Sequence, residues 1–450
     1  MSYPRYPKYK DSGVDWLGDM PEGWSIVPFL GIAKERTESN AGMIEQNLLS
    51  LSYGNIIPKD IGSSDGLLPA SFETYQIVEP DDIVFRLTDL QNDKRSLRTG
   101  IVKERGIITS AYVAVYPSGI YASYFAHLLR AYDEEKVFYS MGGGLRQTLK
   151  YKELSRLPVV LPSETEQQAI AAFLDSECAK TDALIAEQEK LIALLQEKRQ
   201  AVISHAVTKG LNPDAPMKDS GVEWLGEVPI HWTPTRLKFT TEAIVDCPHD
   251  TPLYSEEGQF LVIRTADIFA GILDTTHMYR LEQPDYEHRI RRRSLQKGDI
   301  VYGREGERWG FAALVPEDNM FCLGQRMMQF VPSQDINPSF LMWQLNSRAV
   351  YEQGVVDTVG ATSPHVNVWT IKNYSLVHPP LSEQQAIVAY LDTETAKIDA
   401  LIAEAEKGVV LLKERKSALI AAVVTGKIDV RGLVPAQTLA QAPAQTQEAV

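Results

Sequence analysis

Basic and amide side chains gather at two places in the chain, and these are the residues best suited to contact a ligand. One group lies between residues 86 and 98, with a further arginine at 146, and the other lies between residues 291 and 326. Arginine, glutamine and asparagine can make paired hydrogen bonds to the edges of DNA bases, whereas lysine mainly contacts phosphates. The candidate DNA-binding residues are Arg86, Gln91, Asn92, Lys94, Arg95, Arg98, Arg146, Arg291, Arg292, Arg293, Arg304, Arg308, Gln325 and Arg326.

A second interpretation of the same residues is an ordinary solvated loop whose charges are balanced by neighbouring acids. Asp285, Glu287, Glu305 and Glu307 lie close in sequence to the second group. The basic group recurs after a matching strand-like segment in both halves of the chain, and this recurrence favours DNA contact over a chance distribution of charge.

The sequence lacks the usual signatures of an enzyme. It has no GxxxxGK[ST] phosphate loop, no HExxH zinc motif and no [ND]PP[YF] run of the kind an amino-methyltransferase needs. The glycines of MGGGLR (141–146) match no dinucleotide fingerprint, and the closeness in sequence of Cys247 and His249 is no evidence of a thiol–imidazole pair. We therefore predict no catalytic residue, no metal site and no cofactor.

Composition indicates a soluble chain of several domains that is not uniformly basic. The 450 residues carry a net charge of −14 and 44% hydrophobic residues. Segments 25–162 and 233–381 are nearly neutral, with 15 basic against 16 acidic residues in the first and 14 against 18 in the second.

The three cysteines show no paired spacing, and no run is apolar enough for a signal peptide or a membrane span. We expect buried free thiols and a cytoplasmic location.

Two long stretches of strong helix formers repeat each other at an offset of 217 residues. EQQAIAAFLD begins at Glu166 and EQQAIVAYLD at Glu383, and the identities continue through ALIAE. Apolar residues seven apart predict that the two helices pair as a coiled coil. The predicted pairing or partner-contact residues are Ile170, Leu174, Leu184, Ile185, Leu191, Leu195, Ile387, Leu391, Leu401, Ile402 and Leu412.

A second repeat precedes each globular segment, at an offset of 208 residues. KDSGVDWLGDMPEGW begins at Lys10 and KDSGVEWLGEVPIHW at Lys218, and we call each of these the WLG segment. Its tryptophans, glycines and prolines predict an irregular, well-packed structural cap. Short apolar runs at 48–57, 82–87 and 113–117 predict strands. We also predict helices over 123–138 and 339–354, and a flexible loop at Gly142 to Gly144.

The two WLG segments and the two EQQAI…LD…ALIAE helices resemble the DNA-specificity subunit of type I restriction–modification systems. The resemblance implies an α+β chain with two tandem α/β target-recognition domains, each reading one half of a split DNA site. It also implies that two long helices form an antiparallel coiled coil, as part of an internal pseudo-two-fold repeat. Methylation and ATP-driven cleavage would then belong to partner modification and restriction subunits.

This organisation predicts five segments. They are 1–162 (first WLG segment and recognition domain), 163–210 (first spacer helix), 211–381 (linker, second WLG segment and recognition domain), 382–429 (second spacer helix) and 430–450 (disordered tail). A coiled-coil adaptor with two divergent protein-binding domains is the alternative, and steep salt dependence of binding would favour DNA over it. A single-chain restriction–modification enzyme fits less well, because methyltransferase and nuclease motifs are missing.

Overall fold

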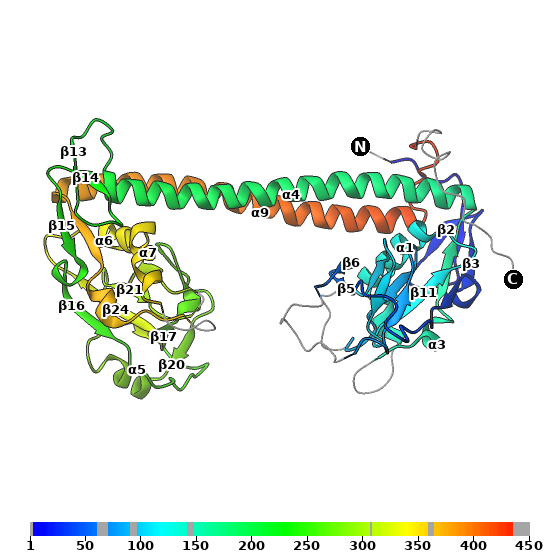
Figure 1. Cartoon of the computed structure of the whole chain (residues 1–450), viewed down its shortest axis with the longest axis horizontal. Helices are drawn as coiled ribbons and strands as arrows, with labels where there is room; N and C mark the ends of the chain where they lie inside the picture. The colour runs from blue at the N-terminus through cyan, green and yellow to red at the C-terminus, as the bar shows by residue number, and fades with distance from the viewer. Residues whose placement is uncertain are drawn as a thin grey trace. The chain divides into compact units, whose positions relative to one another are not determined.

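The computed structural model describes residues 3–60, 71–90, 97–141, 148–306, 308–358 and 364–434. The chain divides into two compact units (Figure 1). Unit 1 comprises Met1–Gln188 with Lys407–Val450, and unit 2 comprises Glu189–Glu406. The mixture of helices and strands expected from the sequence is confirmed. No helix in the described ranges has the length and apolarity that crossing a membrane would require.

The two longest helices are α4 (Glu164–Lys209) and α9 (Leu381–Val424), and each contributes residues to both units. Both are free of proline and rich in alanine, leucine, glutamate and lysine, which favour helix. Each ends before a glycine with positive φ, Gly210 at 77° and Gly426 at 75°. This left-handed conformation closes a helix and is accessible to glycine without a steric penalty.

Unit 1 is built around a four-stranded antiparallel sheet with the order β4-β11-β8-β9. Helix α1 (Ala122–Glu134) packs on β9, and Figure 1 shows it close to the sheet of unit 1. It reaches α4 through a 2.7 Å contact between His127 Nε2 and Asp175 Oδ1. The sheet strands are β4 (Ala33–Glu35), β11 (Val113–Pro117), β8 (Ile83–Phe85) and β9 (Thr99–Ile101).

Four two-stranded antiparallel pairs and several short helices complete the described part of unit 1. The pairs are β1 (Tyr9–Asp11) with β2 (Asp19–Pro21), β3 (Ser25–Pro28) with β12 (Pro158–Leu161), β5 (Leu49–Ser52) with β6 (Asn55–Pro58), and β7 (Gln76–Val78) with β10 (Gly106–Ile108). The short helices are η1 (Phe29–Gly31), α2 (Val137–Met141) and α3 (Tyr151–Leu154). Phe29, Phe85, Phe125 and Phe138 are fully buried and form the centre of the core.

Unit 2 contains a four-stranded antiparallel sheet, β16-β24-β21-β22, and a three-stranded sheet, β20-β17-β23, in which β17 and β23 run parallel. These strands are β16 (Thr241–Asp246), β24 (Met327–Pro332), β21 (Ile300–Gly303), β22 (Ala312–Leu314), β20 (Tyr279–Leu281), β17 (Phe260–Ile263) and β23 (Phe321–Leu323). The two-stranded pairs are β13 (Met217–Asp219) with β14 (Glu227–Pro229), β15 (Thr233–Arg236) with β25 (Ser375–His378), and β18 (Ile268–Phe269) with β19 (Ile272–Leu273). The helices are η2 (Leu237–Phe239), η3 (Thr265–Asp267), α5 (Gln283–Ile290), α6 (Pro338–Leu345), α7 (Arg348–Val356) and α8 (Val368–Lys372).

The WLG segments cap the start of a long helix in each unit. Trp24 is buried, and its indole N–H donates to Glu166 at 3.2 Å. In unit 2 the buried Trp232 donates to Glu383 at 2.9 Å. The structural cap predicted for these segments is confirmed, because their tryptophans bind the glutamate that opens each EQQAI run.

The glutamine after that glutamate has an equally specific role. The Gln167 side chain accepts the Tyr121 backbone N–H at 2.8 Å and donates to the Pro162 carbonyl at 2.9 Å. Gln384 accepts from the backbone of Asn337 and donates to a proline carbonyl at the same two distances. The repeated EQQ letters therefore join each long helix to its globular region.

The two ends of the described chain meet in unit 1. The Asp429 backbone N–H donates to the Pro4 carbonyl at 2.9 Å. The Tyr9 hydroxyl donates to the Gly426 carbonyl at 3.0 Å, directly after α9. The residues just before the first WLG segment are thus bonded to the chain that follows α9, while the segment itself is bonded to the start of α4 through Trp24.

The two predicted helices and the first predicted strand are each divided in the structure. The helix expected over 123–138 breaks at Lys136, where φ is +60°, and the helix over 339–354 breaks where Ser347 caps α7 by accepting from Val350. The run 48–57 forms the β5–β6 hairpin, because Tyr53 and Gly54 both adopt positive φ. The predicted loop at Gly142 to Gly144 and residues 435–450 of the predicted tail lie outside the described residues.

Candidate nucleic-acid interface

Arg304 holds together several loops at one end of the main sheet of unit 2. It follows β21 directly and is buried. Its guanidinium lies 3.1 Å from Glu305 (Nη2 to Oε1) and 3.4 Å from Asp246 (Nε to Oδ1). Its backbone N–H donates to the Arg326 carbonyl at 3.0 Å, and its carbonyl accepts from Val366 at 3.0 Å. Arg304 therefore fixes the loop after β21 to the loops at 246, 326 and 366.

Arg326 lies at the tip of the turn between β23 and β24 and projects from this group of loops. Its φ of +70° is uncommon for a residue other than glycine and indicates a turn held by its surroundings. Its side chain is half exposed, and its Nε lies 3.5 Å from Glu305 Oε2. The neighbouring Gln325 amide donates to the His249 carbonyl at 3.2 Å and to Thr251 Oγ1 at 3.1 Å. The turn is thus anchored on one side while Arg326 remains accessible.

The basic run at the end of α5 contains one buried arginine, which lies within the helix, followed by three exposed ones just after it. The buried Arg289 donates to the carbonyls of Leu323, Pro248 and Asp250 at distances of 2.8 to 3.1 Å. These bonds fix the end of α5 to the turn before Arg326. In the sequence Arg289 belongs to the same dense basic run as Arg291, Arg292 and Arg293, and the letters of the run do not show that it is the buried member.

The three arginines that follow, residues 291 to 293, are all exposed. Arg292 Nη1 donates to the Asp246 carbonyl at 2.8 Å, which brings this run beside the loop that Arg304 also contacts. The structure therefore places Arg292, Arg304, Gln325 and Arg326 on neighbouring loops, and Arg291 and Arg293 flank Arg292 in the chain. We call this group the unit 2 loop cluster.

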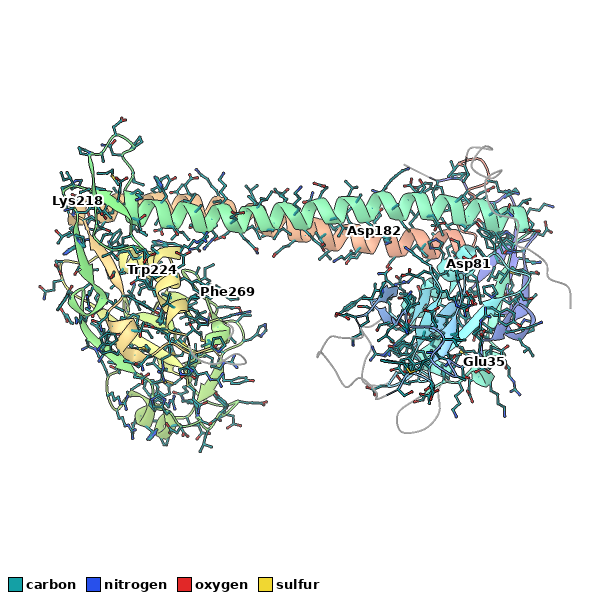
Figure 2. The ribbon with its side chains drawn as sticks, in the orientation of Figure 1. Glu35, Asp81, Asp182, Lys218, Trp224 and Phe269 are labelled. Carbon is teal, nitrogen blue, oxygen red and sulfur yellow. The ribbon has the colours of Figure 1, made fainter. Side chains whose placement is uncertain are left out.

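Arg308 lies on the far side of the β21–β22 loop. Its Nη1 donates to the Ala266 carbonyl at 2.6 Å, and its guanidinium carbon lies 4.3 Å from the centre of the Phe269 ring. Phe269 lies at the margin of unit 2 in Figure 2. The loop also pairs with the segment before α8, since Gly306 donates to the Pro364 carbonyl at 3.0 Å. Arg308 thus connects the β18–β19 hairpin with the unit 2 loop cluster.

One cationic and aromatic group near this surface was missed from the sequence. The Arg264 guanidinium lies 3.8 Å from the centre of the Tyr279 ring and 2.7 Å from Asp267 Oδ1. Hydrogen bonding to Asp267 raises the pKa of Arg264. The available signal was the spacing of three residues between Arg264 and Asp267, which is easily overlooked in a strand-like run.

In unit 1 the structure describes two of the predicted contact residues, Arg86 and Arg98. Arg86 is half-buried, and its backbone N–H donates to the Arg98 carbonyl at 2.8 Å. Arg98 is fully buried, with Nε donating to the Tyr139 hydroxyl at 3.2 Å and Nη1 to the Thr88 carbonyl at 3.1 Å. Its backbone N–H donates to the buried Asp133 carboxylate. Arg98 therefore supports the fold from inside unit 1 and is not accessible to a ligand.

The remaining predicted residues of unit 1 lie outside the described residues. They are Gln91, Asn92, Lys94, Arg95 and Arg146.

The apolar residues predicted for the long helices differ in exposure. Those near the start of each helix are buried against the globular regions, namely Ile170, Leu174, Ile387 and Leu391. Ile185 is also buried, and Leu195, Ile402 and Leu412 are half-buried. Leu184, Leu191 and Leu401 are exposed. The doubled apolar positions thus separate into a packed member and a solvent-facing member.

Ion pairs join α4 to α9 inside each unit. In unit 1 the Lys416 ammonium lies 2.6 and 2.7 Å from the two carboxylate oxygens of Asp182, which Figure 2 labels. In unit 2 Arg199 donates to Asp399 through Nε at 2.7 Å and Nη2 at 3.2 Å, and to the Ala270 carbonyl at 3.0 Å. Arg199 thus connects both helices of unit 2 with the β18–β19 hairpin.

Within the described residues no cluster of three or more histidine, cysteine, aspartate or glutamate side chains is placed to hold a metal ion. The three cysteines are buried and unbonded, as the sequence predicts. Burial raises the pKa of the Cys178 thiol to about 11 and that of Cys322 to about 12.

Comparison with known proteins identifies relatives over most of the chain. Residues 254–407 match the type I restriction modification DNA specificity domain. The chain is 20% identical over 433 residues to the specificity subunit of the type I restriction enzyme EcoKI of Escherichia coli (strain K12), covering 91% of this chain and 90% of that one. It is 24% identical over 275 residues to the specificity subunit of the Escherichia coli enzyme EcoBI, covering 60% of this chain and 58% of that one.

A solved structure shares the fold. A chain from a study of complex assembly and conformational transition in the type I R-M system aligns with a TM-score of 0.64 at 16% identity, covering 90% of this chain and 98% of that chain. The matched domain includes all six residues of the unit 2 loop cluster and the start of α9. On these findings, residues 254–407 carry a type I restriction modification DNA specificity domain, and the chain is similar over most of its length to a specificity subunit of a type I restriction enzyme.

Proposed function

We propose that this chain is a non-catalytic subunit that recognises a bipartite DNA sequence, with one half-site read by each unit. The observation that carries the proposal is the unit 2 loop cluster. Exposed arginines at 291, 293 and 326 surround loops that are held in place by buried Arg289 and Arg304. Base readout needs donors in a fixed geometry, and a guanidinium can bind the O6 and N7 atoms of guanine together. The buried arginines supply that fixed geometry.

For the first half-site we propose the corresponding loop after β8, which begins at Arg86. Arg98 is left out of the contact surface because it is buried and bonded inside unit 1. Gln91, Asn92, Lys94, Arg95 and Arg146 remain candidates for base or phosphate contact in this unit.

We further propose that α4 and α9 form an antiparallel coiled coil that sets the distance between the half-sites. In an antiparallel pair the numbers of facing residues have a constant sum. The ion pair in unit 1 gives 182 + 416 = 598, and the ion pair in unit 2 gives 199 + 399 = 598. Each pair lies within its own unit, so the agreement of the two sums supports one continuous register.

The ion pairs also support a pseudo-two-fold arrangement. Asp399 is the repeat copy of Asp182, since 182 + 217 = 399, and Lys416 is the copy of Arg199, since 199 + 217 = 416. An acid on each helix therefore meets a base on the other. A duplicated sequence that pairs with its own copy produces this exchange.

The solvent-facing leucines of the helices are the proposed docking surface for the modification subunits. Leu184 and Leu401 occupy matching positions, as do Leu194 and Leu411, and all four are exposed. Leucines exposed at matching positions are expected where one kind of partner binds twice. Methyl transfer would then be performed by two docked modification subunits in the cytoplasm, and cleavage by restriction subunits that join the complex.

The test is to co-express the chain with its modification subunits and map methylated adenines on DNA. A split motif with two specific halves and a fixed gap is expected. Replacing Arg326 should then alter the half of the motif that unit 2 reads and leave the other half unchanged. A motif with a single uninterrupted core, or equal relaxation of both halves, would reject the assignment of one half-site to each unit.

A further inference from the structure

A surface at the same place in each unit carries three exposed cations. In unit 1 these are Lys150, Lys152 and Arg156, around α3 and η1. In unit 2 they are Arg236, Lys238 and Lys372, around α8 and η2. Within the described ranges, none of the six has a carboxylate oxygen within 4.0 Å of its charged nitrogens. We call these the flank surfaces of unit 1 and unit 2.

The cations of the unit 2 flank surface are held close together by a neutral group. Arg236 Nη1 and Lys238 Nζ both donate to Asn373 Oδ1, at 3.0 and 2.9 Å. Lys372 precedes that asparagine directly. Two like charges that share one amide oxygen repel each other, and the amide supplies no compensating charge. This arrangement favours the binding of an anion.

The unit 1 flank surface lies at the corresponding junction, with Lys152 on α3 and with Lys150 and Arg156 just before and after it. The Leu30 backbone N–H of η1 donates to the Ser155 carbonyl at 3.1 Å, which holds the end of α3 against η1. Lys152 and Arg156 lie on either side of this junction. The nearby Glu153 carboxylate accepts the Lys150 backbone N–H at 2.9 Å. Glu153 therefore serves as a cap for α3, and none of the lysines in the described part of the chain has its ammonium within ion-pair distance of it.

Different residues supply the charge in the two units. Lys152 and Arg156 correspond to Trp369 and Asn373, since 152 + 217 = 369 and 156 + 217 = 373. Arg236 and Lys238 correspond to Pro28 and Leu30, since 28 + 208 = 236 and 30 + 208 = 238. Each unit still has three cations at this place. The positive charge is present in both units although different positions supply it, and the chain as a whole carries a net charge of −14. This combination points to an anionic ligand that both surfaces share.

Both flank surfaces adjoin the loops proposed to read the half-sites. In unit 1 Leu149, next to Lys150, donates to the Leu87 carbonyl at 3.0 Å, two residues after β8. In unit 2 Val366, just before α8, donates to the Arg304 carbonyl at the same distance. These bonds correspond in the repeat, since 149 + 217 = 366 and 87 + 217 = 304.

We infer that the flank surfaces bind phosphates of the DNA backbone beside each half-site, independently of base sequence. The inference rests on the proposed DNA-reading function and adds to it a site that holds the duplex in register. Phosphate contacts by lysine and arginine fix the position of a protein on DNA without carrying sequence information. They also release counterions, which makes the affinity depend on salt.

The test compares full-length chains assembled with their modification subunits, using a duplex that holds the methylated motif and an unrelated duplex of equal length. One variant carries K150Q, K152Q and R156Q, and another carries R236Q, K238Q and K372Q. Each should bind both duplexes about tenfold or more weakly at ~0.1 M salt, with the slope of log affinity against log salt reduced by up to about 3. The methylated motif should stay unchanged.

Two controls separate charge from folding and from general electrostatics. Variants that exchange lysine and arginine at the same six positions keep the charge and should retain parent affinity. R348Q changes one charge on an exposed arginine that is already paired with Glu352, and it should affect affinity less than K238Q does.

Three results would overturn the inference: an unchanged salt slope, relaxation of one half of the motif, or loss of the modification subunits from the complex. The last would make the flank surfaces protein contacts. Failure of the proposed function is distinguishable, because the unsubstituted complex would then show no preference for the duplex that carries the motif.

Discussion

Asp182 on α4 and Lys416 on α9 form an ion pair in unit 1, with the ammonium 2.6 and 2.7 Å from the two carboxylate oxygens. Their repeat copies, Asp399 and Arg199, form the equivalent pair in unit 2 with the helices exchanged. The two pairs differ in burial, since the Arg199 side chain is 12% exposed and that of Lys416 is 28% exposed. The same interaction should therefore differ in strength between the units.

We expect the Arg199 pair to stabilise the protein more than the Lys416 pair does. K416M removes a partly solvated pair and should lower the free energy of unfolding by no more than about 1 kcal/mol. R199M also removes the bond to the Ala270 carbonyl and leaves Asp399 unpaired, so about 2–3 kcal/mol is expected. Urea unfolding measures both, with K180Q, at an exposed pair with Glu177, as control. Equal losses would contradict the role of burial.

Arg326 and Arg304 should give different phenotypes when each is replaced by alanine. R326A removes a half-exposed guanidinium and should weaken discrimination at one base pair by about 1–3 kcal/mol, seen as relaxation of one half of the methylated motif. R304A removes a buried guanidinium that links several loops, and Asp246 and Glu305 lose their ion pairs with it. It should therefore destabilise unit 2 by roughly 3 kcal/mol. R348A serves as the exposed control. Relaxed recognition by R304A with unchanged stability would reverse the two roles.

The length of the long helices should set the length of the gap in the recognised sequence. Removal of seven residues from the middle of both α4 and α9 keeps the helical faces nearly in phase and shortens each by about 10 Å. Genome-wide mapping of methylated adenines should then show a gap that is about three base pairs shorter, given ~3.4 Å per base pair. Methylation with the original gap would show that the helices do not set the spacing.

The buried carboxyl of Asp133 should make the stability of unit 1 depend on pH. Burial raises the pKa of Asp133 from 3.8 to about 6, so the folded state binds the proton more tightly than the unfolded state does. This contribution is complete below about pH 4 and is lost as the pH rises through 6, a change of up to about 3 kcal/mol. Urea unfolding of the parent and of D133N at pH 4.5 and 7 measures it. D133N should gain stability relative to the parent at pH 7, and an equal difference at both values would contradict the prediction.

The repeated elements of the fold were predictable because their signal is local. Long runs of helix-forming residues without proline allowed α4 and α9 to be predicted, and the spaced tryptophans allowed the structural caps to be predicted. The partners of the EQQ residues could not be predicted in the same way. Glu166 binds Trp24, which is 142 residues away, and such a contact depends on tertiary packing.

The candidate interface was predicted as a set of residues and not as an arrangement. Nothing in the sequence distinguishes Arg98, Arg304 and Arg326. In the structure the first two are buried and bonded inside their units, and the third is accessible. Burial of a guanidinium depends on acceptors that other strands supply, such as the Thr88 carbonyl for Arg98 and Asp246 for Arg304. Helix α5 was missed because its sequence, QPDYEHRI, is short and mostly polar.

The bond between the Pro4 carbonyl and the Asp429 N–H has a mechanical consequence. Both points of attachment lie in unit 1, so tension applied at the two ends of the polypeptide would pass through that contact and the neighbouring Tyr9–Gly426 bond. Unit 2 would bear no stretching force until these bonds and the other contacts that hold the end of α9 in unit 1, such as the Asp182–Lys416 ion pair, had ruptured. In a single-molecule pulling experiment, unit 1 should yield first and shield the loops around Arg326 from the load.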